Sequence, residues 1–437
     1  MRMESIEQSL ITHQTKGMPG GMKPIPLAEI GQQGWNLLAE DLNLPLLVMK
    51  DSALVHNGQW MRKFLEISGA VLSPHGKTSM APQLFKRQIA DGSWAITCAT
   101  VGHLQVYRDA GVPRVLMANQ LVGKQAIRYV MEELRRDPDF DFYCLVDSVR
   151  GVELLAEGAK AHPAGRPLQV FLEMGVQGQR NGCRDLEGAL AVARAVKAAA
   201  PHLSLRGVEG FEGVIHEKTP AAQVEAVTAF LDRIGEAGLA CNAEALFGEG
   251  EVVLTAGGSN YYDLVIERFR RVELGRPKRI VTRSGCYLTQ DHGGYAKAYA
   301  DLLQRSPEAR GLGEGLLPAL ELWAYVQSRP EPTRLLCGFG KRDVGMDSGY
   351  PMPVGWFRPG VHSAPQALNA GAGPADSVVV EMNDQHGFLD VPTDSPLQAG
   401  DLLKLGIKHP CTTFDKWRVV PIVDDEYTVR DAVRTFF

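Results

Sequence analysis

The chain has 437 residues and a formal net charge of -5, a length that suits two domains or one barrel with an addition. It has no basic block and no apolar run long enough to span a bilayer, so we expect neither nucleic-acid nor membrane binding. Seven scattered cysteines without a CxxC pair indicate free thiols in a reducing cytoplasm. The polar segment 1–23 lacks the apolar centre of a secretory signal.

Residues 1–43 are predicted to form an extension that packs on the second domain and contains a short helix, Ala28–Asp41. Leu44–Met49 is then predicted to be a strand, with Pro45 near its start, where a missing N–H is tolerated. These segments precede a long stretch in which strand and helix patterns alternate.

The alternation predicts an α/β fold. The strand-like runs are Ala70–Leu72, Ala95–Cys98, Arg114–Met117, Phe142–Val146, Leu168–Leu172, Arg206–Phe211, Val252–Leu254 and Arg279–Thr282. The helical patterns between them are Val101–Ala110, Gln125–Arg136, Val149–Ala161, Leu186–Ala199 and Ala221–Ala237. About eight strands alternating with helices predict a (β/α)8 barrel over residues 44–303, with a doubly wound open sheet as the alternative.

Residues 304–437 have a different sequence pattern. Short β-like runs are separated by loops rich in glycine and proline, which is typical of a mostly β domain. The runs are Trp323–Gln327, Thr333–Cys337, Ser377–Met382, Leu402–Ile407 and Arg418–Val423.

Lys77 lies where the first predicted barrel strand ends and a loop begins. In α/β folds that edge is where ligands bind. A lysine at the wall of a pocket loses solvation, and its amine becomes a better nucleophile for a carbonyl. An ordinary solvated surface lysine is the alternative, so other stretches must support the assignment.

The loop 255–260, Thr-Ala-Gly-Gly-Ser-Asn, directly follows the predicted strand Val252–Leu254. Glycines let the backbone approach an anion, and the next helix offers unpaired N–H groups. Phosphate sites in barrels lie after strands seven and eight, which favours a phosphate site here over a simple tight turn.

His409-Pro410-Cys411 follows the predicted strand Leu402–Ile407. Residues two apart on an extended chain share a face, so a histidine and a thiolate can bind one Zn²⁺. Two protein ligands suit a catalytic ion with positions open to substrate or water. A packed strand end is the alternative interpretation.

The motif Pro-His-x-Lys-Thr at 74–78, the Gly257–Ser259 loop and the His409/Cys411 pair occur in one order along the chain. With these motifs in this order, the chain resembles pyridoxal-phosphate enzymes of the alanine-racemase type. Among those enzymes, it resembles the D-serine dehydratase and D-threonine aldolase group. The resemblance implies a barrel of the alanine racemase N-terminal type, in which Lys77 carries pyridoxal 5'-phosphate as a Schiff base. It also implies a C-terminal β domain that binds Zn²⁺ or another divalent metal.

The resemblance also implies roles for residues around the cofactor. Arg180 would reach its phenolic oxygen, since a guanidinium stabilises a phenolate. Cys286 and Tyr287 would lie near the phosphate, and His386 would lie near the site. The implied cofactor-binding set is His75, Lys77, Arg180, Glu209, Thr255, Gly257, Gly258, Ser259, Cys286 and Tyr287, and the implied catalytic residues are Lys77 and His386.

The segment 205–213 aligns with a family strand whose tyrosine faces the cofactor's ring nitrogen, and Phe211 stands at that position. Glu209 and Glu212 lie beside it, and a carboxylate on the nitrogen would hold it protonated. Alternation puts Glu209 on the face of Phe211, while the choice between the two carboxylates stays open.

The resemblance favours a lyase: a cytoplasmic homodimer that dehydrates and deaminates a D-3-hydroxy amino acid such as D-serine to a keto acid and ammonia. The nearest alternative is a metal-dependent D-threonine aldolase. An amino-acid racemase and a non-catalytic pyridoxal-phosphate carrier are further alternatives. The long C-terminal region argues against a carrier, which needs no metal domain.

Overall fold

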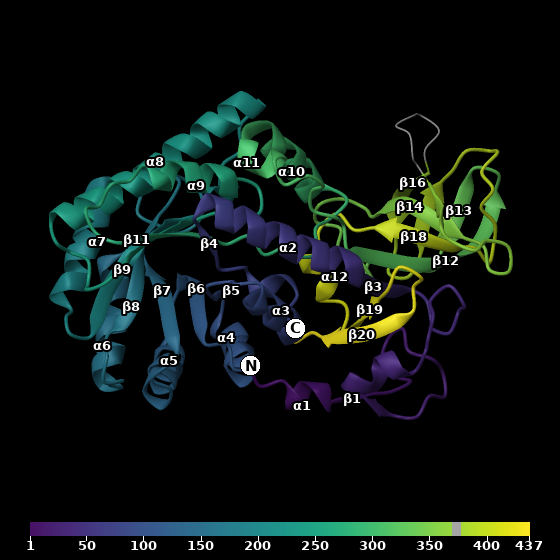
Figure 1. Cartoon of the computed structure of the whole chain (residues 1–437), viewed down its shortest axis with the longest axis horizontal. Coiled ribbons are helices and arrows are strands. Elements are labelled where there is room, and N and C mark those ends of the chain that lie inside the picture. Colours follow the sequence, from purple (N-terminus) through teal and green to yellow (C-terminus); the bar gives the residue numbers. More distant parts are fainter. Residues whose placement is uncertain (369–376) are drawn as a thin grey trace.

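The computed structural model describes residues 1–368 and 377–437, and its first large unit is a curled sheet of parallel strands (Figure 1). The neighbour order β4-β11-β10-β9-β8-β7-β6-β5 runs around the sheet. A parallel bridge between His75 and Thr97 joins its two ends. The predicted (β/α)8 barrel is therefore confirmed, and the alternative prediction of a doubly wound open sheet is wrong. Its strands are β4 (Val71–Leu72), β5 (Ile96–Cys98), β6 (Arg114–Gln120), β7 (Asp141–Val146), β8 (Leu168–Met174), β9 (Leu203–Gly210), β10 (Val252–Ala256) and β11 (Lys278–Thr282).

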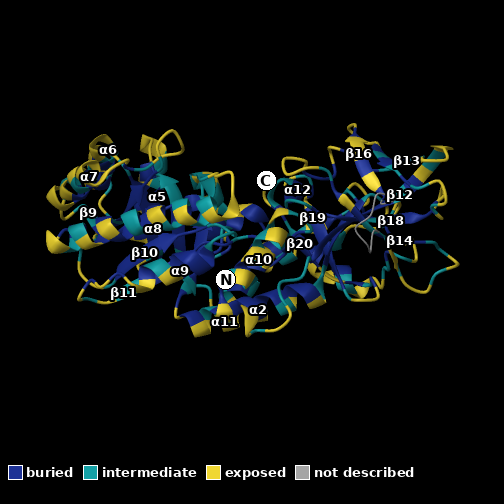
Figure 2. Cartoon of the chain, turned by 90° about the horizontal axis from the view of Figure 1, so that it is seen from above, coloured by how far each residue is buried: buried dark blue, intermediate teal, exposed yellow. Residues whose placement is uncertain are grey.

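Helices cover the outside of this barrel, with buried inner faces and exposed outer faces (Figure 2). In α5 the buried residues Ile127, Val130, Met131 and Leu134 are three or four positions apart, so they form one stripe toward the sheet. Within the described residues, none of the helices has the length and apolarity needed to cross a bilayer. The helices are α2 (Asp51–Ser68), α3 (Pro82–Ala90), α4 (Val101–Asp109), α5 (Lys124–Arg136), α6 (Val149–Ala161), α7 (Leu186–Ala198), α8 (Pro220–Ala243), α9 (Tyr262–Arg270), α10 (Gly294–Arg305) and α11 (Pro307–Arg310).

The barrel interior is filled by side chains. Tyr143 and Phe171 stack with ring centroids 5.0 Å apart, and they pack with Leu116, Val253 and Val281 in one buried cluster. A filled interior leaves space for a ligand only above the strand ends.

The second unit is a mostly antiparallel sheet. Leu46–Lys50 (β3), which the sequence placed in the barrel region, pairs instead with β12 and β19 of this sheet. An apolar run predicts a buried strand but not the sheet it joins, and α2 then carries the chain across to the barrel. The other elements are β12 (Leu320–Glu331), β13 (Arg334–Cys337), β14 (Met352–Phe357), β15 (Gln366–Ala367), β16 (Val378–Met382), β17 (Gly387–Asp390), β18 (Leu402–Gly406), α12 (Cys411–Phe414), β19 (Val419–Val423) and β20 (Val429–Arg434).

The predicted helix Ala28–Asp41 is wrong. Only a 3-10 turn, η1 (Leu27–Gln32), forms, because Gly34 has a φ of 71° and the Asn36 side chain accepts a 2.8 Å hydrogen bond from the Leu38 N–H. An asparagine that bonds its own backbone favours a turn over a helix. The remaining elements of this segment are α1 (Glu4–Glu7), β1 (Leu10–Ile11) and β2 (Ile25–Pro26).

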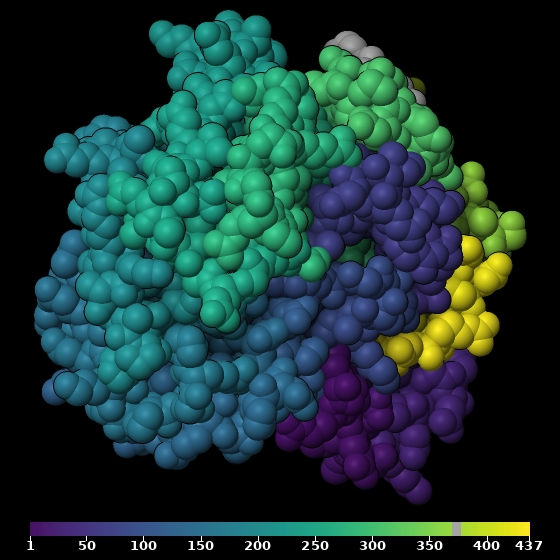
Figure 3. Space-filling model, turned by 60° about the vertical axis from the view of Figure 1, so that its left-hand side comes forward, coloured from purple at the N-terminus to yellow at the C-terminus, as the bar shows by residue number. Residues whose placement is uncertain are grey.

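The N-terminal extension lies against the second sheet and the C-terminal strands, and Figure 3 shows the purple and yellow segments side by side on one face. Lys16 forms a 2.6 Å ion pair with the buried Asp343, and its amine lies 3.7 Å from the Trp417 ring centroid. Arg434 donates a 2.9 Å hydrogen bond to the Leu10 carbonyl. The extension is thereby joined to residues more than 300 positions later in the chain.

Candidate active site

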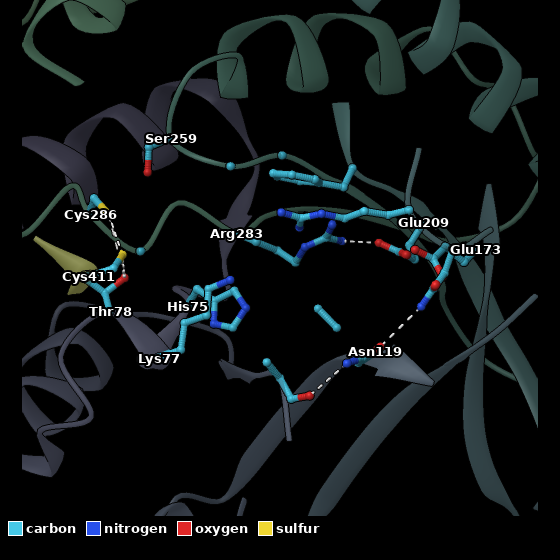
Figure 4. A pocket seen from close by; sticks show the side chains of 18 of the residues that line it. His75, Lys77, Thr78, Asn119, Glu173, Glu209, Ser259, Arg283, Cys286 and Cys411 are labelled. Atoms are coloured by element: carbon cyan, nitrogen blue, oxygen red, sulfur yellow. Dashed lines mark hydrogen bonds and ion pairs between the residues drawn. The ribbon is translucent and has the colours of Figure 1, made fainter. Parts of the chain in front are cut away.

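A cavity of about 470 Å³ lies at the carboxyl ends of the barrel strands, and residues of both units line it (Figure 4). Sulfur atoms lie at one end, carboxylates at the other, and Lys77 between them. The lining residues are His75, Lys77, Thr78, Ala99, Ala118, Asn119, Glu173, Arg180, Asn181, Glu209, Phe211, Gly257, Gly258, Ser259, Arg283, Gly285, Cys286, Tyr295 and Cys411.

Lys77 lies on a 3-10 turn, η2 (Gly76–Thr78), just after β4, and its side chain is exposed to the cavity. Two glycines allow this turn to pack closely. A Cβ on Gly76 would come within 2.3 Å of the Tyr107 hydroxyl, and one on Gly285 within 2.6 Å of the His75 carbonyl oxygen. Neither neighbour can move easily, so the lysine is presented from a fixed turn.

His75 lines the cavity beside Lys77, and its buried Nδ1 has no hydrogen-bond partner among the described residues. Burial, followed by the positive charges of Lys77 and Arg283, lowers the pKa of His75 well below its usual range. The ring is therefore neutral where it borders the cavity.

At the sulfur end, the Sγ atoms of Cys286 and Cys411 are 3.7 Å apart, and the Thr78 hydroxyl lies 3.5 Å from Cys411. The sequence predicted that His409 and Cys411 share a face of an extended strand. That local prediction is wrong, because Pro410 has helical dihedrals and Cys411 is the first residue of α12. The turn still brings Cys411 into the cavity.

The charge state of this end depends on neighbouring groups. A hydrogen bond from Cys286 and the nearby His409 ring lower the pKa of Cys411 to about 4. The same thiolate and Asp347 raise the pKa of His409 to about 9. In the absence of a metal, the pair is thus a thiolate and an imidazolium, and an ion bound there would displace the imidazolium proton.

Asp347, which the sequence did not single out, orients His409. Its carboxylate lies 2.5 Å from His409 Nδ1 and accepts a 2.5 Å hydrogen bond from the Thr412 hydroxyl. A carboxylate on Nδ1 leaves Nε2 as the metal-binding atom, the usual arrangement around a metal-bound histidine. Among the described residues, no group of three His, Cys, Asp or Glu side chains is already placed around a common ion position.

The opposite end holds two carboxyl groups and a buried arginine. Arg283 forms a 2.7 Å ion pair with Glu209, and it donates hydrogen bonds to the Thr255 hydroxyl at 3.0 Å and the Gly210 carbonyl at 2.9 Å. Burial, and then the charge of Glu209, raise the pKa of Glu173 to about 8. This end therefore carries one neutralised carboxylate and one carboxyl group that is protonated at neutral pH.

The structure answers which of the two glutamates faces inward. Glu209 lines the cavity, whereas Glu212 lies behind the loop and accepts a 3.1 Å hydrogen bond from the Gly258 N–H. The Gly258 donor expected for a phosphate is thus already used. Among the described residues, none accepts a hydrogen bond from the backbone N–H groups of Ser259, Gly285 or Cys286, all of which border the cavity.

The other predicted residues divide between those in the cavity and those outside it. Arg180 lines the cavity with its guanidinium 5.0 Å from the Phe211 ring centroid. Thr255 is fully buried and reaches the site only through Arg283. Tyr287 is buried outside the cavity lining. His386 is exposed in the turn between β16 and β17, so this chain does not bring it to the cavity.

Sequence reasoning missed several lining residues. Asn119, Glu173 and Arg283 follow or end β6, β8 and β11, and polar residues at the carboxyl ends of barrel strands are the signal that could have identified them. Tyr295 lies in the first turn of α10, away from any strand end. Its position became apparent only when the structure placed its ring 6.1 Å from the His409 ring centroid.

Two family models match the chain, one on each unit. Residues 50–248 match the alanine racemase N-terminal domain, and residues 319–423 match the "Putative serine dehydratase domain". The first match begins at the end of β3, where the chain crosses to the barrel.

Similar proteins cover most of the chain. A 3-hydroxy-D-aspartate aldolase of Paracoccus denitrificans is 24% identical over 387 residues, which are 87% of this chain and 88% of the relative. The crystal structure of D-threonine aldolase from Filomicrobium marinum matches with a TM-score of 0.71 and 22% identity, over 92% of this chain and 97% of that one. A metal-free cysteine-to-alanine mutant of D-threo-3-hydroxyaspartate dehydratase matches with a TM-score of 0.67 and 19% identity, over 92% and 99%.

Proposed function

We propose that this chain, a member of the alanine-racemase-type group of pyridoxal-phosphate enzymes, is a metal-dependent lyase that dehydrates and deaminates a D-3-hydroxy amino acid. One observation carries the proposal: Lys77 from the barrel and Cys411 from the second domain line the same cavity. A carrier of the cofactor needs only the lysine. The thiolate of Cys411, with the His409 imidazole beside that thiolate, indicates chemistry at a second substrate atom.

The cavity fits pyridoxal phosphate. Backbone N–H groups of Ser259, Gly285 and Cys286 without an acceptor in the described part of the chain, together with the Ser259 hydroxyl, suit a phosphate. Arg180 suits the phenolic oxygen, and the volume is within the range of small-molecule sites. When bound, the cofactor supplies an electron sink for negative charge at the substrate α-carbon.

Lys77 would hold the cofactor covalently and, once released by the substrate amine, act as the base that removes the α-proton. It is the amine that projects into the middle of the cavity from a turn fixed by Gly76 and Gly285. A positioned base of this kind contributes about 10²–10⁴-fold to a rate. The neutral ring of His75 lies beside it and adds no competing positive charge.

Glu209 is not free to bind a ring nitrogen as an isolated carboxylate, because Arg283 already neutralises it at 2.7 Å. Glu173 beside it holds its proton at neutral pH. We therefore assign this end of the cavity a polar but nearly uncharged character. Arg283 and the protonated Glu173 are its hydrogen-bond donors.

The opposite end fits a divalent metal. Cys411 and His409 supply a thiolate and an imidazole, and Asp347 leaves His409 Nε2 as the ligand atom. Such an ion supplies a Lewis acid for the substrate β-hydroxyl. A structurally similar protein, D-threo-3-hydroxyaspartate dehydratase, is described in a metal-free form, which supports a metal in proteins of this fold.

The surroundings of the sulfur end favour elimination over retro-aldol cleavage. Retro-aldol cleavage needs a base for the proton of the β-hydroxyl, whereas elimination needs a group that assists a leaving oxygen. The cavity lining at this end offers the hydroxyls of Thr78 and Tyr295, and the neighbouring Cys286 raises the pKa of Tyr295, so it stays a donor. The lining carboxyl groups, Glu173 and Glu209, lie at the other end.

Product identification tests the proposal. The purified enzyme, loaded with pyridoxal phosphate and zinc, is incubated separately with D-serine, D-threonine, D-threo-3-hydroxyaspartate and their L-isomers. Keto acid and ammonia from a D-substrate support the proposal, and the L-isomers serve as controls. No turnover of any of them with both cofactors bound would overturn it.

A metal-dependent D-3-hydroxy amino acid aldolase is the second candidate. It is favoured by the two aldolases that match about nine-tenths of the chain. It would use the same lysine and the same metal ligands. Glycine and an aldehyde, in place of a keto acid and ammonia, identify this activity in the same assay.

A further inference from the structure

The two sulfurs at the metal end come from different units of the chain. Cys286 follows barrel strand β11 and is 4% exposed, whereas Cys411 begins α12 of the second domain. Their Sγ atoms are 3.7 Å apart. Two thiolates on one tetrahedral zinc ion, each about 2.3 Å from it, are about 3.8 Å apart. The sulfurs thus already have the separation that a shared ion requires.

The sequence assigned Cys286 to the phosphate through its N–H, and its side chain has no role there. That side chain points instead to Cys411 in Figure 4. The Thr78 hydroxyl lies 3.8 Å from Cys286 and 3.5 Å from Cys411. These are long contacts for sulfur, so an ion bound between the two sulfurs would replace only weak hydrogen bonds.

His409 is the movable member of the set. Its side chain is 22% exposed, and its ring lies two residues before Cys411 with Nδ1 against the Asp347 carboxylate. Asp347 holds Nδ1 and Thr412 holds Asp347, so the ring can turn with Nε2 still directed away from the carboxylate. A rotation of the ring toward the sulfurs is needed, because among the described residues the three groups do not surround one point.

We propose that Cys286 is a third protein ligand of the divalent ion, so that Cys286, His409 and Cys411 form a Cys2His site with its fourth position open to the cavity. The inference rests on the proposed metal-dependent function and adds a ligand to it. Three protein ligands with one open position are typical of catalytic zinc. Two thiolates favour Zn²⁺ over harder ions such as Mg²⁺ and Mn²⁺.

Sulfur counting on the zinc-loaded wild-type enzyme tests the ligand without any substitution. Zinc-edge X-ray absorption is expected to give two sulfur ligands per zinc at about 2.3 Å. One sulfur per zinc would overturn the third ligand and leave the proposed function intact. An enzyme that binds no divalent metal at all would overturn the metal-dependent function and this inference together.

Cobalt substitution gives an independent readout. The near-ultraviolet charge-transfer absorption per bound Co²⁺ is expected to fall by about half in Cys286→Ala and Cys286→Ser, with at least about a tenfold loss of zinc affinity. Cys337→Ala, which removes a buried thiol from β13, is the matched control and should retain both. An unchanged absorption per cobalt and an unchanged zinc affinity in both Cys286 variants would overturn the inference.

Discussion

Lys77 and Glu173 represent two ways in which single residues control this site. Lys77 acts through its position, since a turn packed against Tyr107 and Gly285 presents its amine to the cavity. Glu173 acts through its environment, since burial and a neighbouring carboxylate keep its proton in place. Each gives a prediction that a substitution can test.

Lys77→Ala should lose the visible absorbance of bound cofactor and lower the rate of elimination by at least about 10²-fold, because it removes both the covalent attachment and the base. Borohydride reduction of the wild type, followed by peptide mapping, should label Lys77. Lys124→Ala, at the start of α5, is the control and should keep absorbance and activity. Labelling of Lys50 or Lys124 in place of Lys77 would contradict the assignment.

Glu173 makes the stability of the cofactor-free protein depend on pH. Its folded pKa is about 8 against an unfolded value of 4.5, so the folded state binds the proton more tightly. The stabilisation that this proton gives the folded state is complete below pH 4.5. It is lost as the pH rises through 8, at up to about 1.4 kcal/mol per pH unit. The melting temperature of the wild type should therefore fall between pH 5.5 and 8.5.

Glu173→Gln removes the titrating proton and keeps an acceptor for the hydrogen bond from Gln120. Between pH 5.5 and 8.5, the melting temperature of this variant should fall by less than that of the wild type, and the two falls should differ by about 2 °C or more. The exposed Glu225→Gln should behave like the wild type. Parallel curves for the wild type and Glu173→Gln would show that Glu173 does not carry the effect.

Close contacts between elements position these residues. The loop after β10 passes Phe211 so closely that a Cβ on Gly258 would lie 3.1 Å from its ring. The N-terminal extension contacts the second unit in part through Lys16, which pairs with the buried Asp343. Both contacts join parts of the chain that are distant in sequence.

Gly258→Val should lower cofactor affinity by about tenfold or more while the fold is kept, because a branched side chain would enter the space between Phe211 and the cavity. Cofactor titration followed by absorbance measures the loss. Gly20→Val, where nothing lies within 4 Å of the added Cβ, is the control. If Gly258→Val binds the cofactor as tightly as the wild type does, the loop is a simple turn and not a phosphate site.

Lys16→Ala should destabilise the protein by about 1–3 kcal/mol, because it leaves the fully buried Asp343 carboxylate without its 2.6 Å ion pair. Denaturant unfolding measures the change, and the exposed Lys23→Ala serves as the control. Equal stability of the two variants would mean that the extension contributes little through this contact.

In the whole molecule, the cavity is assembled from both units. The barrel supplies Lys77, and the second domain supplies Cys411 with His409 next to it. The two units are connected by α2 and by the segment that contains α10 and α11. An ion between them therefore couples the chemistry of the site to the stability of the assembly.

Chelation should abolish elimination of D-serine and leave the visible absorbance of the cofactor intact, because the cofactor is attached to the barrel. It should also lower the melting temperature of the wild type, since saturation at a hundredfold excess over Kd is worth about 2.7 kcal/mol. Cys411→Ala should behave like the chelated enzyme and respond to chelation in neither assay.

A β-chloro substrate separates the role of the metal in the leaving group from its role in structure. Chloride needs little help to leave, so Cys411→Ala should turn over this substrate at a rate closer to that of the wild type. Full elimination of D-serine by metal-free Cys411→Ala would show that His409 and Cys411 serve packing alone.

The sequence by itself determined the barrel and the order of its chemical motifs. Alternating apolar runs and amphipathic helices are local patterns, so β4 to β11 were identified within a few residues. Lys77, Gly257 and Cys411 could be placed at strand ends for the same reason. When a short motif directly follows a predicted strand, its location at the end of that strand can be predicted from the sequence.

Only the tertiary structure decided the contacts between these segments. It placed β3 in the second sheet, paired Arg283 with Glu209, and brought Cys286 within 3.7 Å of Cys411 across 125 positions. It also left His386 exposed at a turn. Local patterns record which side of a strand or helix is buried, whereas the partner that buries it depends on chain segments far away in the sequence.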